Sequence, residues 1–199
     1  DGVVRRYLPF RINQGGERIP TFGFQILNKF YGKSNKYTIT NDKLYFHYNS
    51  KRIPKFDKAS FLIDFWGGDK YFPRFNFLDV LDDSEFKTSE EIDYEEDINV
   101  WDDSSFGIKN SGIFKNKIVL IGSTLPEDKD IIPISFSRGE KKGDNLIYGI
   151  ELHGHLIHSV IKDNYLYNIP IVFSILSIIF LTAFVFAISS KLKGYKVKY

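Results

Sequence analysis

The stretch YGIELHGHLIHSV, residues 148–160, has the apolar spacing of an amphipathic helix and holds three of the four histidines in the chain. At about 100° per residue, Leu152, Leu156 and Val160 form one apolar stripe. His153 lies at the edge of this stripe, so we expect its ring to pack inward. The stretch therefore predicts a helix that packs on the core through a narrow apolar face.

The other two histidines, His155 and His158, fall on the opposite side of this helix, together with Glu151. Two interpretations are open, because the three side chains could bind a metal ion or simply form a solvated face. We expect the solvated face and no metal site, since nothing nearby supplies a clear fourth ligand. Glu151 also has an ordinary role in the first turn, where a carboxylate complements the helix dipole.

Upstream of the helix, NKIVLIGST (116–124) is the best candidate for a buried strand. Its continuous apolar run is typical of a central parallel strand that is covered on both faces. In open α/β sheets, ligands bind beyond the carboxyl ends of such strands. The loop that follows has a single glycine, so it is neither a P-loop nor a dinucleotide-binding motif, and we expect no cofactor.

The predicted fold is α/β (or α+β), a mixed sheet with a central buried strand flanked by helices, plus one C-terminal transmembrane helix. A helix is expected within 20–33, with Thr21 as its cap and Gly32 as its stop. His47 alternates within a strand and is interpreted as structural. The other predicted elements are strands within 5–12, 36–40, 43–49 and 60–67 and a short helix within 72–83.

An acidic segment, about 83–112, interrupts this pattern. It could be a calcium site, but it lacks the glycine that an EF-hand loop needs at its turn. We therefore interpret it as an exposed, partly disordered insertion whose like charges repel one another.

The C-terminal part of the chain predicts a membrane helix. No charged residue occurs from 164 to 190, and about 20 apolar residues suffice to cross a bilayer. We assign 167–190 to the transmembrane helix and 191–199 to a basic tail. Lys191, Lys193, Lys196 and Lys198 in that tail predict a cytoplasmic location under the positive-inside rule. Residues 1–168 would then lie in the periplasm or outside the cell.

Composition limits the other possibilities. The chain has 199 residues, no Cys and no Met, so we interpret it as a piece of a longer protein. Its net charge of +2 provides no strong basic field for phosphates, and no nucleic-acid partner is expected. Without the four tail lysines, the remainder is mildly acidic.

Four stretches resemble the extracellular CHASE domain of type 2, which occurs in bacterial transmembrane signalling proteins. They are DGVVRRYLPF (1–10), FLIDFWGG with FPRFNFLDVL (61–81), FKNKIVLIGSTLPEDKDIIPISF (114–136) and YGIELHGHLIHSVI (148–161). Positions that match the family are Gly122, Thr124, Pro126, Asp130, Pro133, Gly149, Glu151 and His153. His155 and His158 do not match, and Ile134–Ser135 replaces the usual Thr–Pro.

The resemblance implies the C-terminal part of a sensor domain, 1–166, in a bacterial inner-membrane receptor. It also implies a missing N-terminal segment and a cytoplasmic output such as a nucleotide cyclase or a protein kinase. The expected partners are the lipid bilayer, an unknown small-molecule or protein ligand, and a second copy that pairs through the membrane helices. The alternatives are a membrane-anchored α/β enzyme that uses IGST and His153, or an ectodomain that only dimerises.

A ligand site is hypothesised where the loop after 118–122 meets the start of the histidine helix. The loop contributes Ser123, Thr124 and Asp130, and the helix contributes Glu151 and His153. The helix N-terminus adds free N–H groups for a polar or anionic ligand. In the competing interpretation, Thr124, Asp130 and Glu151 only fasten the loop to the helix. No catalytic residue is assigned.

Overall fold

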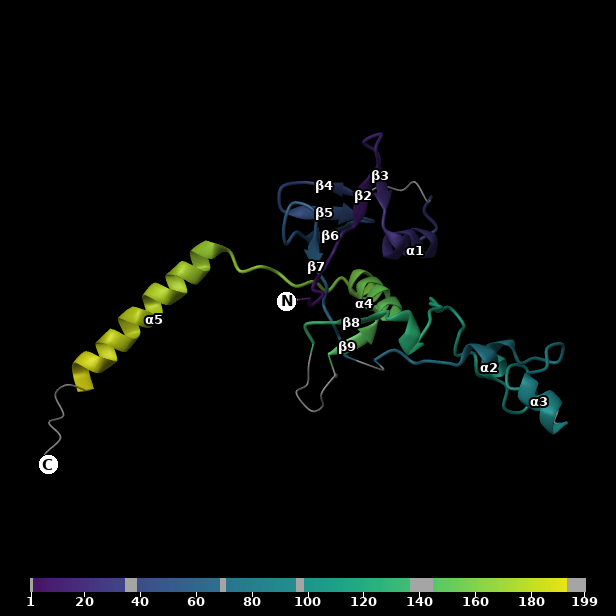
Figure 1. The fold of residues 1–199 in the computed structure, drawn as a ribbon. Helices are drawn as coiled ribbons and strands as arrows, with labels where there is room; N and C mark the ends of the chain where they lie inside the picture. The colour runs from purple at the N-terminus through teal and green to yellow at the C-terminus, as the bar shows by residue number, and fades with distance from the viewer. Residues whose placement is uncertain (1, 35–38, 69–70, 96–98, 137–144, 193–199) are drawn as a thin grey trace, which may run out of the picture. The chain divides into compact units, whose positions relative to one another are not determined.

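The computed structural model describes residues 2–34, 39–68, 71–95, 99–136 and 145–192 (Figure 1). The chain divides into two compact units, 1–165 and 166–199, and each is described by itself. The first unit contains strands β1 (Arg6–Tyr7), β2 (Phe10–Ile12), β3 (Arg18–Pro20), β4 (Thr40–Asn41), β5 (Tyr45–Tyr48), β6 (Lys51–Pro54), β7 (Phe61–Leu62), β8 (Ile131–Pro133) and β9 (Leu146–Tyr148). Its α-helices are α1 (Phe22–Phe30), α2 (Phe77–Leu81), α3 (Ser89–Tyr94) and α4 (Gly149–Lys162).

These strands form short antiparallel sheets. The largest has the order β4-β5-β6, and the others pair β1 with β7, β2 with β3, and β8 with β9. The strands predicted within 36–40 and 43–49 are antiparallel neighbours where they are described, since Thr40 lies opposite His47 in β5. One isolated parallel bridge joins Val4 to Ile134. The mixed α/β class is therefore confirmed, although the described strands form several small sheets.

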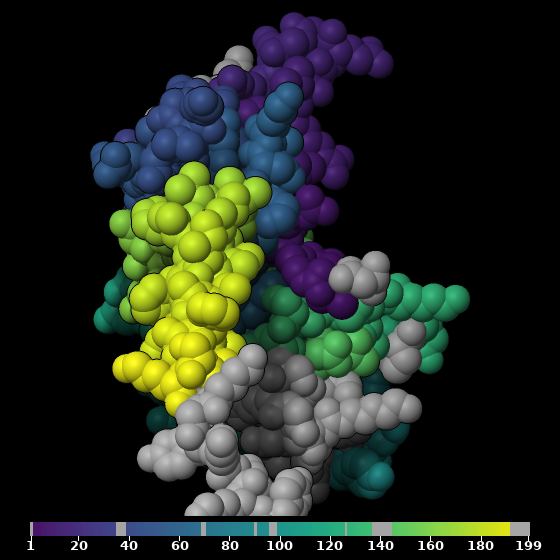
Figure 2. Space-filling view, turned by 90° about the vertical axis from the view of Figure 1, so that its left-hand side faces the viewer, coloured from purple at the N-terminus to yellow at the C-terminus, as the bar shows by residue number. Residues whose placement is uncertain are grey.

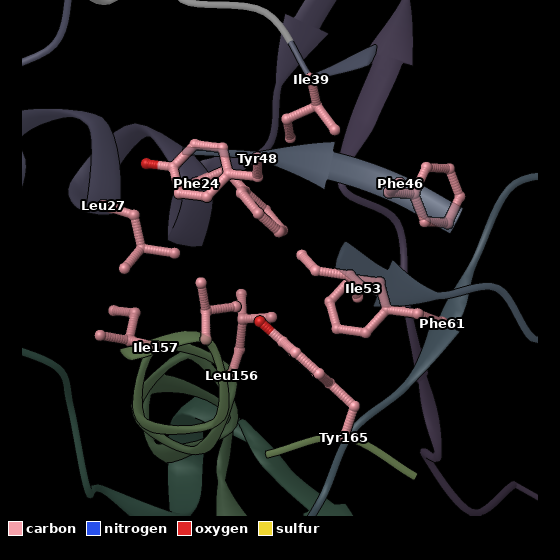
Figure 3. Close-up of a cluster of buried hydrophobic side chains, with 11 residues drawn as sticks. Phe24, Leu27, Ile39, Phe46, Tyr48, Ile53, Phe61, Leu156, Ile157 and Tyr165 are labelled. Carbon is pink, nitrogen blue, oxygen red and sulfur yellow. The ribbon is translucent and has the colours of Figure 1, made fainter. Parts of the chain in front are cut away.

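Helix α4 packs against α1 and the three-stranded sheet. Leu156 and Val160 are fully buried, as the apolar stripe predicts, and Leu152 is half-buried against a second, smaller cluster. Figure 3 shows Leu156 and Ile157 pointing from α4 toward the side chains of α1 and the sheet. A Cβ added at Gly23 of α1 would lie 2.2 Å from the Leu156 Cδ2 atom, so only glycine allows this close approach.

Helix α1 confirms the prediction for 20–33, since it follows Thr21 and ends just before Gly32, whose φ is +64°. Its inward face does not include every apolar residue of the helix. Phe24 and Leu27 are fully buried, whereas Phe22 is 50% exposed. The Thr21 hydroxyl donates to the carbonyl oxygen of Leu8 at 2.8 Å instead of capping the helix.

The prediction of a central buried strand at 118–122 is wrong. The segment is extended but belongs to none of the described strands, and Val119 and Ile121 are 52% and 72% exposed. Ile118 and Leu120 do pack against the core. Buried and exposed side chains thus alternate along this segment as they do in a strand. The described residues cover only one of its faces, and no described strand pairs with either of its edges.

The acidic insertion is also more ordered than expected in its described part. Thr88 and Glu91 form a capping box at the start of α3. Asp82 is buried and accepts a 3.1 Å hydrogen bond from the Val100 N–H. Burial and the neighbouring carboxyl of Glu91 raise the pKa of Asp82. Local capping and the hydrogen bond from Val100 therefore order this part of the segment, although the raised pKa of Asp82 shows that the repulsion between carboxyls persists. Residues 96–98 lie outside the described range.

The second unit contains helix α5 (Ile171–Leu192). Residues Ile171–Lys191 are long and apolar enough to cross a membrane, and none of this window is buried. Figure 2 shows the helix in yellow, with its side chains uncovered on the face in view. Residues 193–199 of the predicted basic tail lie outside the described range. Residues 36–38 of the strand predicted within 36–40 also lie outside it.

Candidate functional site

The start of α4 is held in place by Glu151. Its side chain is buried, and Arg74 donates to its Oε1 from Nη2 at 2.8 Å and from Nε at 3.1 Å. The second carboxylate oxygen accepts the Tyr148 N–H at 3.3 Å. The Arg74 guanidinium also lies over the Tyr148 ring, 5.0 Å from its centroid. Glu151 thus fastens α4 to the segment around Arg74, and not to the loop at 123–130.

Ser123 and Thr124 are exposed in the loop that leads to a short 3-10 turn, Pro126–Asp128. The Ser123 hydroxyl accepts the N–H of Leu125 at 3.1 Å, which is a local turn contact. Neither side chain lines the hollow described below. The structure therefore does not bring these two hydroxyls together with the helix residues.

Asp130 does contact the start of α4. Its carbonyl oxygen accepts the Gly149 N–H at 2.9 Å. A Cβ added at Gly149 would lie 2.2 Å from the Asp130 Oδ1 atom, so the carboxylate lies directly against the glycine. Glycine is required here by close approach, because any side chain would displace the carboxylate.

His153 is half-buried and connects three elements. Its Nδ1 lies 3.1 Å from the hydroxyl of Tyr7 in β1, and that hydroxyl also accepts the Gly23 N–H of α1 at 3.2 Å. The Phe22 ring meets the imidazole edge-on at 4.8 Å. Burial lowers the pKa of His153, and the nearby Asp130 carboxylate partly opposes that shift. The ring is therefore neutral at pH 7.

Asp130 and His153 both line an open hollow of about 370 Å³. Its walls include Phe22 and Ile132, and its edge includes Gly122. A Cβ added at Gly122 would lie 2.8 Å from the Cβ of Ile150, so the loop runs close to α4. Of the five residues expected at the site, the structure thus brings Asp130 and His153 together around one cavity.

The prediction that His155 and His158 form a solvated face is wrong. His155 is fully buried among Phe65, Tyr71 and Phe72, and His158 stacks on the Trp66 ring at 4.9 Å. The reason is that the rings of Phe65, Trp66, Tyr71 and Phe72 cover this side of α4. An aromatic run, FWGGDKYF (65–72), was the available sequence signal. Among the described residues, no group of three or more His, Cys, Asp or Glu could hold a metal ion.

Neither ring nitrogen of His155 has a hydrogen-bond partner among the described residues. Burial lowers the pKa of His155 to about 4, with a smaller contribution from His158. The neutral ring is therefore enclosed as an aromatic side chain.

Comparison with known proteins gives one family. The family model described as "CHASE2 domain" matches residues 1–188 of the chain. No curated protein and no solved structure matches the chain.

We predict that His155 makes folding pH-dependent. Its pKa is lower in the folded than in the unfolded chain, so the unfolded chain binds the proton first as the pH falls. The free energy of unfolding should therefore be constant above about pH 6.5 and should fall toward pH 4, by about 3 kcal/mol in total. Urea unfolding from pH 4 to 7.5 should show a flatter pH profile for His155→Leu than for the original protein.

Phe24→Leu provides the control, because it removes buried aromatic volume but no group that titrates in this range, and it should lower the free energy of unfolding without changing the pH slope. At pH 7, His155→Leu should be as stable as the original protein or more so, because it removes two buried polar atoms without partners. An unchanged slope in His155→Leu, or a large loss of stability at pH 7, would contradict this interpretation.

Proposed function

We propose, for a chain that belongs to the CHASE2 family, that residues 1–166 sense a ligand outside the cytoplasm and control a cytoplasmic output domain. CHASE2 domains are sensor domains of signalling receptors. The chain also contains a helix that is apolar and long enough for a membrane. The output that we propose is a nucleotide cyclase or a protein kinase in another part of the same protein.

The observation that carries the proposal is the short connection between the site and the membrane helix. Helix α4 carries His153 in its first turns and ends at Lys162, and α5 begins at Ile171. Residues 163–170 alone separate the two helices. A ligand that binds two conformations of the first unit unequally, with α4 moving together with the elements packed on it, would therefore act on α5 through this connection.

The alternative of an anchored enzyme has less support. The His153 ring bonds to Tyr7, and the Ser123 hydroxyl bonds to the Leu125 N–H. Among the described residues, these contacts therefore do not pair the Ser123 hydroxyl of IGST with the His153 base. A purely dimerising ectodomain remains compatible with the fold, but it gives no role to the cavity that Asp130 and His153 share. Pairing of two copies through α5 is part of our proposal.

We further propose that residues 1–168 lie in the periplasm or outside the cell, with the basic tail in the cytoplasm. The support is the distribution of lysines, since Lys191 lies in the last turn of α5 and three more lysines follow the helix, without an acid among them.

Fusions of alkaline phosphatase test this topology in bacterial cells, because the enzyme needs disulfides that form only outside the cytoplasm. A fusion at Asp144 should be active and one after Tyr199 inactive. β-Galactosidase at the same two positions is the complementary control and should give the reverse result. An active phosphatase after Tyr199 would contradict the proposed orientation.

Sensing is tested in the full-length receptor with Asp130→Asn and His153→Gln. Each variant should change basal or stimulated output by about fivefold or more, because a coupling energy of 1–3 kcal/mol has that effect. The measurement is cyclic-nucleotide production or autophosphorylation in isolated membranes, according to the output domain.

The matched controls are Asp128→Asn in the same loop and His47→Gln in β5, since neither residue lines the cavity. Expression and melting temperature should be equal in all four variants. If the site variants fold and signal like the controls, the cavity is not the sensing site. If instead the site variants unfold, the fastening role of Asp130 gains support.

A further inference from the structure

A second, larger hollow of about 700 Å³ opens beside the candidate site, between β1, the β2–β3 hairpin and the start of α1. His153 and Phe22 line both hollows. This second hollow contains none of the loop residues 123–130. Its volume is within the range of about 300–1,000 Å³ that is typical of small-molecule sites.

The charge around this second hollow has one sign. Arg6 and Arg11 line it, and no Asp or Glu does. Arg6 is already engaged, because its Nη1 donates to the Asp57 carboxylate at 3.1 Å. Arg11 is exposed and has no acidic partner among the described residues. One positive charge is therefore left without compensation at the cavity wall.

Apart from Asn13 and Thr21, most of the remaining wall is apolar or aromatic, and several of its apolar side chains are exposed. Ile19 lies directly opposite Arg11 in the β2–β3 hairpin and is 46% exposed. Ile12 is 66% exposed, and Leu8 and Phe22 also present large apolar surfaces. An uncovered apolar patch beside a free cation is typical of a binding site.

Tyr7 and His153 give the wall of the hollow both polar atoms and aromatic surface. Tyr7 and His153 are joined by a 3.1 Å contact between the hydroxyl and Nδ1. The Nε2 atom of His153 has no hydrogen bond among the described residues. Because His153 lines the hollow, this nitrogen adds a polar group to a wall that the Tyr7 and Phe22 rings flank.

From this arrangement we infer that the hollow binds a small carboxylate with an apolar or aromatic body. The guanidinium of Arg11 matches the two oxygens of a carboxylate through paired N–H donors. A single free positive charge suits a monoanion better than a phosphate, which carries about −1.5 to −2 at pH 7. The apolar body would cover Ile19, on the same face of the hairpin as Arg11, together with Leu8 and Phe22. The inference gives a ligand class to the proposed sensing function and rests on it for its biological meaning.

Direct binding tests the inference with phenylacetate as the probe and phenylacetamide as its neutral counterpart. The full-length receptor is placed in nanodiscs of zwitterionic lipid, with empty nanodiscs as the blank, and binding is measured by calorimetry. Phenylacetate should bind saturably, and phenylacetamide should bind at least about tenfold more weakly, because a charge-assisted hydrogen bond is lost. This comparison needs no variant.

Arg11→Gln should weaken phenylacetate binding by about tenfold and leave the weak binding of phenylacetamide unchanged. Arg52→Gln is the matched control, since Arg52 is an exposed strand arginine that lies over the Tyr45 ring, away from the hollow. Equal affinity for acid and amide, equal binding by the two variants, or no saturable binding would overturn the inference. Because binding is measured without a signalling readout, its failure is distinguishable from a failure of the sensing function.

Discussion

The burial of α4 on two opposite sides is the constraint on which the rest of the first unit depends. On one side, Leu156 fits against Gly23 of α1. On the other side, His155 is enclosed by Phe65, Tyr71 and Phe72. Burial of an apolar side chain such as Leu156 contributes about 1.5–3 kcal/mol, and the rings around His155 pack on the opposite side of the helix. The position of α4 then determines where His153 lies, and with it the two hollows that this residue lines.

Local periodicity was enough to predict the elements that one apolar face defines. Three such elements are present: the buried stripe through Leu156 and Val160, the helix after Thr21, and the strand pair that contains His47. Periodicity could not predict the second buried side of α4, because histidine is polar and its aromatic cover comes from residues far away in the sequence. The same limit applies to Glu151, whose partner Arg74 is equally distant in sequence.

The site was predicted in part for similar reasons. Asp130 and His153 meet because one follows the 118–122 segment and the other begins α4, two features that the sequence signals. Burial of the 118–122 segment was predicted from its apolar composition on both faces, but the described residues cover only Ile118 and Leu120. Arg11 was not predicted as a binding residue, because the sequence does not show which residues surround it. Only the structure shows that apolar side chains lie beside Arg11 and that, among the described residues, no acidic partner does.

Amide hydrogen exchange of the full chain in nanodiscs tests the central claim most directly, namely that α4 is the fixed centre of the first unit. Amides of residues 153–160 should be among the slowest to exchange, because their helix is buried on both sides. Amides of 118–122 should exchange close to the unprotected rate, since no strand pairs with them among the described residues. Exchange of α4 as fast as that of 118–122 would contradict the account.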